Sequence, residues 1–343
     1  MGKSEKYHVR SLKASEMRAW ETLVSDQTTS RSAFDSVLWL QANARIFPNN
    51  DVEAYGVFHK DRQVAGLTAY VRRRGPLRVV AAPIMSFYHS LALPDYPTSY
   101  RRTLNRHEQL HALLPALESR FDSIELRLDP SIRDIRPFIW RGWEIRVSYT
   151  YRLSLDSDQA VQIGFNRNFR KLIRRGEDAG LTAIPCRDIE GIVHLHRKVY
   201  DAQQIAPPLT DRQMEKLLTD IFSSNLAEGW GAYDPEGKLV AVDVTIQDNK
   251  RAYMFLSASD PDRRQTGASA FLRRHLFRQL RERMPEVDLT GADISRVARF
   301  KSSMGGELIP YYRVKKHTTA LGKFTMGAYE FSHTLRSKIL RIF

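Results

Sequence analysis

The amino-acid sequence predicts a mixed α/β (α+β) fold made of two tandem copies of one unit. The chain has 343 residues, which is enough for about two domains of average size. Hydrophobic residues make up 42% of the chain and charged residues 27%, as is typical of globular proteins. This composition excludes a wholly disordered chain.

An internal repeat is the observation that suggests tandem copies. Residues 54–67 (AYGVFHKDRQVAGL) and residues 229–242 (GWGAYDPEGKLVAV) both consist of an aromatic-rich apolar strand, a polar turn and a second apolar strand. The two segments lie about half a chain length apart, which favours duplication of one α/β unit. The alternative is that any two hairpins look alike.

In the first half, apolar residues recur at helical spacing over 34–47 and 108–121, which predicts helices there. Apolar runs and alternating patterns predict strands at 66–72, 78–82 and 123–128. Residues 143–154 are strand-like and mark the expected join between the two halves.

The second half shows the same mixture of patterns. Helical spacing predicts helices at 159–177, 188–203, 210–222 and 267–283, with Gly180 as the C-cap of the first. Apolar runs predict strands at 229–234, 238–247, 251–257 and 287–289. We therefore predict an N-terminal domain over 1–150, a C-terminal domain over 151–316 and a basic amphipathic helix over 317–343.

The charge balance indicates anionic partners. Lys and Arg number 53 against 39 Asp and Glu, which gives a net charge of +14. Nucleic acid, phosphorylated co-substrates and acidic lipid all fit such a surplus. The single cysteine, Cys186, excludes an intramolecular disulfide, and the ten scattered histidines predict no metal site. The polar start and the lack of a long apolar run predict a cytoplasmic protein.

Two segments are candidates for binding donor phosphates. A glycine-containing turn after the strand at 253–259 opens a helix, and the free backbone N–H groups of such a helix start can hold a phosphate beside Arg263 and Arg264. The helix at 159–177 carries a basic stripe opposite its aromatic face, consisting of Arg167, Arg170, Lys171, Arg174 and Arg175. The alternatives are an ordinary helix start and a solvated basic face.

The candidate catalytic residues follow the strand at 287–289. Asp288 ends that strand, a loop holds Gly291 and Asp293, and a short helix carries Phe300 and Lys301. A lysine in this position can stabilise a developing oxyanion or orient an acyl group, and either carboxylate can accept a proton. The alternative is that Lys301 is solvated or salt-bridged.

These segments occur in a recognisable order. They are Tyr151-Arg-Leu-Ser-Leu, Phe165-Asn-Arg-Asn-Phe-Arg-Lys-Leu-Ile-Arg-Arg, Gly237-Lys-Leu-Val-Ala, Asp288-Leu-Thr-Gly, and Phe300-Lys301 before Gly305-Gly306-Glu307. In this the chain resembles the FemAB-like branch of the GNAT acyltransferase superfamily, which includes peptidoglycan-bridge aminoacyltransferases. The match is most specific over residues 145–316.

The resemblance implies two tandem GNAT-like acyltransferase domains and transfer of an acyl group to an amine. It implies acyl-CoA or aminoacyl-tRNA as the donor co-substrate, no tightly bound cofactor, and an amine acceptor such as a lipid-linked cell-wall precursor. Phe300 and Lys301 match the family's Phe-Lys pair, whose lysine assists the tetrahedral intermediate. The pyrophosphate loop of GNAT proteins corresponds to Arg264, Gly267, Ala268 and Ser269. The serine departs from the usual final glycine or alanine, so both donors stay open.

The C-terminal segment concentrates positive charge. From residue 296 to the last residue there are ten Lys or Arg and two acids, and an apolar stripe recurs at helical spacing from Leu321 to Ile342. Such a helix can lie on an anionic inner-membrane surface or pack on its own domain. The rival interpretations of the whole chain are a non-enzymatic nucleic-acid-binding protein and a scaffold with degenerate GNAT domains. The oligomeric state stays open.

Overall fold

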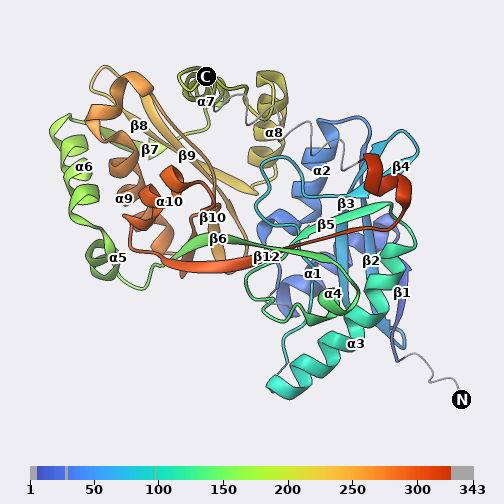
Figure 1. Ribbon diagram of the computed structural model, residues 1–343. Coiled ribbons are helices and arrows are strands. Elements are labelled where there is room, and N and C mark those ends of the chain that lie inside the picture. The colour runs from blue at the N-terminus through green and yellow to red at the C-terminus, as the bar shows by residue number, and fades with distance from the viewer. Residues whose placement is uncertain (1–5, 28–29, 97, 326–343) are drawn as a thin grey trace, which may run out of the picture. The chain divides into compact units, whose positions relative to one another are not determined.

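The structure is a computed structural model that describes residues 6–27, 30–96 and 98–325. The chain forms two compact units. Unit 1 contains the described residues up to Val147 and those from Tyr311 onward, and unit 2 contains Ser148–Pro310. Each unit combines helices with a sheet, which confirms the mixed α/β fold class (Figure 1).

The predicted domain boundaries lie at residues 150 and 316, whereas the boundaries between the two units fall inside two strands. These strands are β6 (Glu144–Ser154) and β12 (Glu307–His317). A boundary inside a strand has no linker, and so no change of composition marks it in the sequence.

Unit 1 combines a six-stranded part of the sheet with helices. Its elements are β1 (His8–Ser11), α1 (Ala14–Gln27), η1 (Ala33–Asp35), α2 (Val37–Arg45), β2 (Asn50–His59), β3 (Arg62–Arg74), β4 (Leu77–Val80), α3 (Ser99–Glu118), β5 (Ser123–Arg127) and α4 (Arg136–Trp140). The sheet order is β1-β2-β3-β4-β5-β12, antiparallel except for the parallel pair β4 and β5.

Unit 2 repeats this plan. Its elements after β6 are α5 (Asp158–Gly164), α6 (Arg167–Asp178), β7 (Thr182–Pro185), α7 (Ile189–Asp201), α8 (Asp211–Ser223), β8 (Ala227–Tyr233), β9 (Leu239–Gln247), β10 (Arg251–Ser259), η2 (Pro261–Thr266), α9 (Ala268–Arg281), β11 (Glu286–Asp288) and α10 (Ser295–Ser302). The sheet order is β7-β8-β9-β10-β11-β6, antiparallel except for the parallel pair β10 and β11.

The correspondence extends to single residues of the two hairpins. β2 and β3 pair antiparallel with an irregularity between Val57 and Phe58, and β8 and β9 pair antiparallel with one between Ala232 and Tyr233. A β-bulge at the same place in both copies is a specific feature that two unrelated hairpins do not share by default. The structure thus confirms that one unit is used twice.

The core of unit 2 explains where its helices lie. Leu276, Phe277 and Leu280 of α9 are buried in one cluster with Phe165 and Phe169. Helix α9 covers the sheet, and α6 packs along α9 (Figure 1). The two phenyl rings of Phe165 and Phe169 have their centres 4.8 Å apart.

The predicted helix at 159–177 is in fact two helices, α5 and α6. The break falls at Asn166, whose side-chain oxygen accepts a hydrogen bond from the Phe169 N–H at 2.8 Å and so caps α6. Asparagine is among the best N-cap residues, and this preference outweighs the helical spacing across it.

The predicted C-terminal helix at 317–343 lies mostly outside the described residues, which end at 325. Strand β12 runs through His317, so helical structure begins only at residue 320. The first two members of the apolar stripe, Leu321 and Phe324, are 54% and 78% exposed. Within the described ranges, no helix is both long and apolar enough to cross a membrane.

Candidate active site

The candidate site of unit 2 begins where its two parallel strands stop pairing. Tyr253 of β10 and Asp288 of β11 are the last paired residues, and β10 continues to Ser259. The chain after β11 turns at once, and the Thr290 hydroxyl donates a hydrogen bond to the Met254 carbonyl oxygen at 2.6 Å. The turn after β11 is therefore bonded to β10 just beyond the last paired residues.

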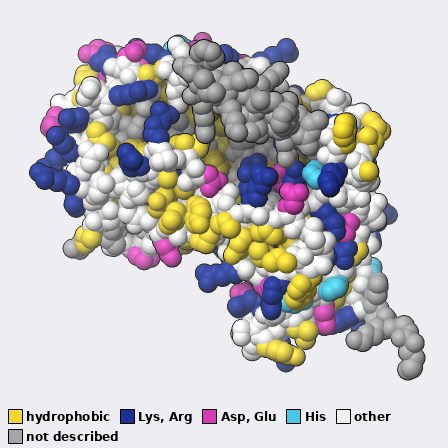
Figure 2. Space-filling view, in the orientation of Figure 1, with side chains coloured by type: hydrophobic (Ala, Val, Ile, Leu, Met, Phe, Trp, Pro, Cys, Tyr) yellow, Lys and Arg dark blue, Asp and Glu magenta, His cyan; other side chains and the backbone are white. Residues whose placement is uncertain are grey.

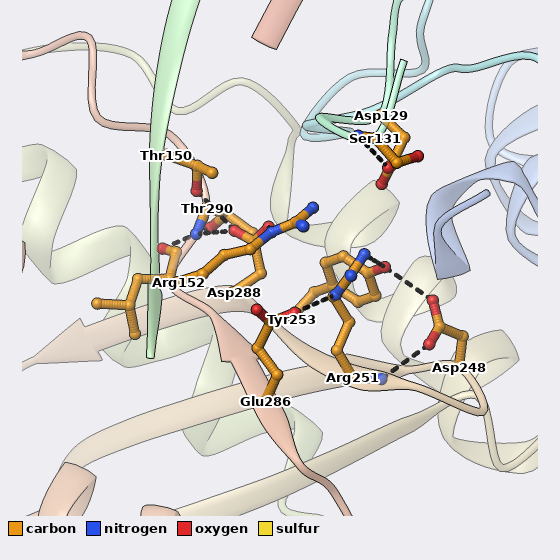
Figure 3. Close-up of polar contacts among 11 residues, drawn as sticks. Asp129, Ser131, Thr150, Arg152, Asp248, Arg251, Tyr253, Glu286, Asp288 and Thr290 are labelled. Atoms are coloured by element: carbon orange, nitrogen blue, oxygen red, sulfur yellow. Dashed lines mark hydrogen bonds and ion pairs between the residues drawn. The ribbon is translucent and has the colours of Figure 1, made fainter. Parts of the chain in front are cut away.

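The carboxylate of Asp288 is fully buried and fully engaged. Its Oδ1 accepts hydrogen bonds from the Thr150 hydroxyl at 2.6 Å and the Thr290 N–H at 2.8 Å, and its Oδ2 accepts one from Arg152 Nε at 3.0 Å (Figure 3). These contacts hold the turn to β6. They argue against the predicted role of Asp288 as a proton acceptor, because both oxygens already have donors.

The turn itself has an unusual backbone. Thr290 has φ of 53° and Gly291 has φ of 44°. A β-branched residue rarely adopts this left-handed region, which costs about 1–3 kcal/mol and needs support from its surroundings. Both carbonyl oxygens of the turn accept hydrogen bonds from Lys301 Nζ, and the bond to Gly291 measures 2.8 Å.

The two carbonyls therefore hold the Lys301 amine near the end of α10, and its protonation state determines what it can still offer to a substrate. Burial, together with the charge of Arg273, lowers the pKa of its amine to about 7, although Asp288 and Asp243 oppose this. The ammonium form has three N–H donors, so it keeps one after bonding two carbonyls. The neutral form has two donors and keeps a lone pair. The site thus offers either a donor or a proton acceptor near neutral pH.

Phe300 and Lys301 are accompanied by two buried charged residues that the sequence analysis did not identify. Arg273 of α9 lies over the Phe300 ring at 4.7 Å, and its Nε lies 3.4 Å from Asp243 Oδ2 on β9. Burial raises the pKa of Asp243. A signal existed. Asp243 interrupts an apolar strand, and Arg273 lies at helical spacing from the buried Ala270, Leu276 and Phe277 of α9.

Asp293 lies on the exposed side of the same loop. Its Oδ1 accepts a hydrogen bond from the Tyr149 N–H at 2.9 Å. Because this side chain is exposed, it keeps room for a further contact and stays a candidate proton acceptor.

The predicted phosphate loop opens α9, as expected. Gly267 has φ of 74°, and Ala268 is buried, while Ser269 is half-buried and Arg264 is exposed. A Cβ at Gly267 would lie 2.1 Å from the Leu172 carbonyl oxygen of α6. The glycine thus permits close packing of α6, which gives it a purely structural reason to be there.

Replacing Gly267 by alanine should destabilise unit 2 by more than the same change at Gly237. Both residues have positive φ, but a Cβ at Gly237 meets nothing within 4 Å. Gly237→Ala should cost only the left-handed strain of about 1–2 kcal/mol, and Gly267→Ala this strain plus the clash. Urea denaturation of both variants checks this. Equal reductions in stability would show that α6 yields freely and that the packing argument is wrong.

Helix α6 carries the other predicted phosphate contacts. Its five basic residues, Arg167, Arg170, Lys171, Arg174 and Arg175, are all exposed. Figure 2 shows Lys and Arg side chains gathered over this helix at the left of the molecule. They lie on the helix that packs against the start of α9, so the two predicted phosphate-binding segments are neighbours.

The family of acetyltransferase (GNAT) domains matches residues 164–302, which spans most of unit 2 and includes Asp288, Phe300 and Lys301. The second unit is a GNAT domain. Unit 1 has the same strand order and the same bulge, so the two units share one fold. GNAT domains are acyltransferases, so the family indicates transferase chemistry.

Solved structures agree with the tandem fold. The crystal structure of FemX matches with a TM-score of 0.69 at 12% identity, over 89% of this chain and 96% of that one. A tandem GNAT protein from the clavulanic acid biosynthesis pathway matches at 0.55 and 13% identity, over 91% and 99% of the chains. The C-terminal domain of a putative lysylphosphatidylglycerol synthetase from Agrobacterium fabrum matches at 0.57 and 13%, over 91% and 95%. They confirm the FemAB-like resemblance at the level of fold. No curated protein sequence matched.

Proposed function

We propose that this tandem GNAT protein transfers an acyl or aminoacyl group to an amine, with Lys301 as the catalytic residue of unit 2. The observation that carries the proposal is the position of Lys301 Nζ, which two backbone carbonyls of a strained turn hold at the end of β11. Such fixed groups at a site of charge development lower a reaction barrier because no reorganisation is needed.

In the proposed reaction the amine nitrogen forms a bond to the acyl carbon, and the carbonyl oxygen takes up negative charge. The third N–H of the Lys301 ammonium donates to that oxygen. Collapse of the intermediate breaks the C–S bond of a thioester or the C–O bond of an aminoacyl ester. The leaving thiolate or alkoxide takes up the proton that the amine nitrogen releases, with Asp293 as the candidate carrier.

The rate of transfer should fall as pH rises through about 7, because deprotonation of Lys301 removes the donor to the oxyanion. Single-turnover rates across the pH range check this. In Lys301→Arg the rate should no longer fall through this pH range, since an arginine stays protonated. A rate that instead rises through about 7, with this rise absent in Lys301→Arg, would make the neutral amine a proton acceptor and contradict the oxyanion role.

The donor co-substrate is an acyl-CoA or an aminoacyl-tRNA, and both carry phosphates. The exposed basic face of α6 beside the start of α9 supports contact with them.

A thermal-shift panel separates the two donors, because a ligand that binds the native state raises its melting temperature. Stabilisation by charged tRNA and not by acyl-CoA would assign the donor, and the reverse result would assign acyl-CoA. Stabilisation by neither would favour the scaffold interpretation. Tight binding to arbitrary RNA would favour a nucleic-acid-binding protein.

If tRNA is the donor, removing charge from α6 should weaken its binding more than removing the same charge elsewhere. The double variant Arg170→Ala, Lys171→Ala should lower the salt slope of tRNA binding by about one for every phosphate that the protein no longer neutralises. The control is Arg212→Ala with Arg281→Ala, which removes the same charge from exposed positions of α8 and α9. Equal effects of the two doubles would exclude a specific contact with α6.

The acceptor is proposed to be an amine of a cell-envelope precursor, including lipid-linked ones. The FemX and lysylphosphatidylglycerol synthetase likenesses support this class. A basic C-terminal segment supports a place in the cytoplasm at the anionic inner-membrane surface.

A further inference from the structure

Asp243 and Arg273 are ionisable side chains that the mechanism above does not use, although they lie next to its two key residues. Asp243 is 2% exposed and Arg273 is 7% exposed. Charged groups this deeply buried carry a large desolvation cost. The cost calls for a reason beyond packing, because apolar side chains of similar size would stabilise the same space at least as well.

The contacts between them are loose for a structural ion pair. Arg273 Nε lies 3.4 Å from Asp243 Oδ2, and Arg273 Nη2 lies 3.5 Å from Asp243 Oδ1. Within the part of the chain that the structure describes, Arg273 Nε and Nη1 and Asp243 Oδ2 complete no hydrogen bond. A pair built only for stability would form close bidentate bonds instead.

The Arg273 guanidinium also contacts Phe300. It lies 4.7 Å from the centre of the Phe300 ring, and Phe300 immediately precedes Lys301 on α10. Phe300 in turn lies 5.9 Å from Phe169 of α6, so the ring is held between α9 and α6. A cation over an aromatic face is worth about 0.5–2 kcal/mol when desolvated.

We propose that Asp243 and Arg273 are a positioning pair for Lys301, in which Asp243 holds Arg273 and Arg273 fixes Phe300 and the adjoining lysine. This inference rests on the proposed function, because it assigns the pair its role through Lys301. The charged groups around Lys301 come from three other elements, namely Arg273 of α9, Asp243 of β9 and Asp288 of β11. Arg152 of β6 contacts this set at Asp288, with its Nε 3.0 Å from Asp288 Oδ2.

The signs of these charges make the pair testable without a known substrate. Arg273 disfavours the protonated form of Lys301, and Asp243 favours it. Arg273→Met should therefore raise the pKa of Lys301, and Asp243→Asn should lower it. Arg273→Lys keeps the charge but lacks the planar stack, so it should leave the pKa near its original value while reducing turnover.

The experiment is a pH titration of the full chain with ¹³C-labelled lysine, observed by NMR, with Lys301→Ala to assign the signal. Arg281→Met is the matched control, since Arg281 is exposed on the same helix and should not move the Lys301 pKa. Thermal unfolding of each variant verifies the fold. Where Arg273→Met does not fold, Asp243→Asn still carries the test, because it should lower the Lys301 pKa whereas Arg273→Lys should leave it unchanged.

The expected result is opposite pKa shifts in Arg273→Met and Asp243→Asn, with a fall in kcat at unchanged KM once a donor is known. An unmoved Lys301 pKa in folded Arg273→Met and in folded Asp243→Asn would overturn the positioning role, whatever the activity of the protein. Abolished transfer in Lys301→Ala is a separate measurement. Failure of the pair and failure of the proposed function are therefore distinguishable.

Discussion

Replacing Lys301 by alanine should reduce the rate constant of acyl transfer by about 10²–10³-fold, the usual effect of removing one preorganised oxyanion donor. The physical reason is the geometry of its amine. Two carbonyl oxygens of the Thr290-Gly291 turn orient Nζ, so the third N–H needs no rearrangement when charge develops on the substrate. Single-turnover kinetics with the donor identified by thermal shift measures the reduction.

The matched control for this prediction is Arg299→Ala. Arg299 is exposed on the same short helix and has the same sign of charge, so its removal should change the rate by less than about twofold. Thermal unfolding of the lysine variant should stay close to that of the parent protein. Full activity in a folded Lys301→Ala protein would exclude the proposed chemistry of unit 2.

Replacing Asp288 by alanine should cost about 3–5 kcal/mol of folding free energy, the range found when one partner of a buried ion pair is removed. Arg152, whose side chain is 9% exposed, would be left without this carboxylate, and the Thr150 hydroxyl and the Thr290 N–H would be left without their acceptor. Urea denaturation followed by circular dichroism measures the change. Activity should fall too, because the turn that holds Lys301 would no longer be supported.

Asp293→Ala provides the contrast for the stability measurement. Asp293 belongs to the same loop but is exposed and accepts a single backbone hydrogen bond, from Tyr149. Its removal should cost about 1 kcal/mol. A similar cost for both aspartates would mean that the buried network contributes no more than an exposed bond, and would contradict the structural role given to Asp288.

Together these contrasts separate two roles that the sequence alone assigns to either aspartate. Asp288 and Asp293 are equal candidates for the proton acceptor at that level, because a loop of unknown shape can present either one. The structure buries Asp288 among three donors and exposes Asp293. Only Asp293 therefore keeps an oxygen available to a substrate.

Much of the fold is predictable because local patterns determine it. The strand–turn–strand repeat at 54–67 and 229–242 indicates the duplication, and the shared bulges before Phe58 and Tyr233 confirm it. The sequence predicts a continuous helix at 159–177 because side-chain periodicity does not register a cap. Asn166 ends the first helix by bonding the backbone of the second, which is a single contact rather than a pattern.

The site is predictable in its residue types but not in its arrangement. Phe300 and Lys301 are found from a family motif, whereas Asp243 and Arg273 escape notice because they lie 30 residues apart on elements that are adjacent only after folding. The turn that contains Gly267 precedes α9, and its role in binding phosphate stays a prediction. Its glycine, however, makes room for the Leu172 carbonyl of α6, which no spacing rule within the loop reveals.

The sequence by itself determined that this is a tandem α/β protein, with its candidate chemistry in the second half and much of its positive charge near α6 and the C-terminus. These properties depend on composition, periodicity and short motifs, which are local. Tertiary structure alone decided that Lys301 bonds two carbonyls of a strained turn, that Asp288 is buried among three donors, and that Arg273 lies between Asp243 and Phe300. Burial decides each of these outcomes, because the pKa of an amine and the availability of a carboxylate depend on neighbours that other elements supply.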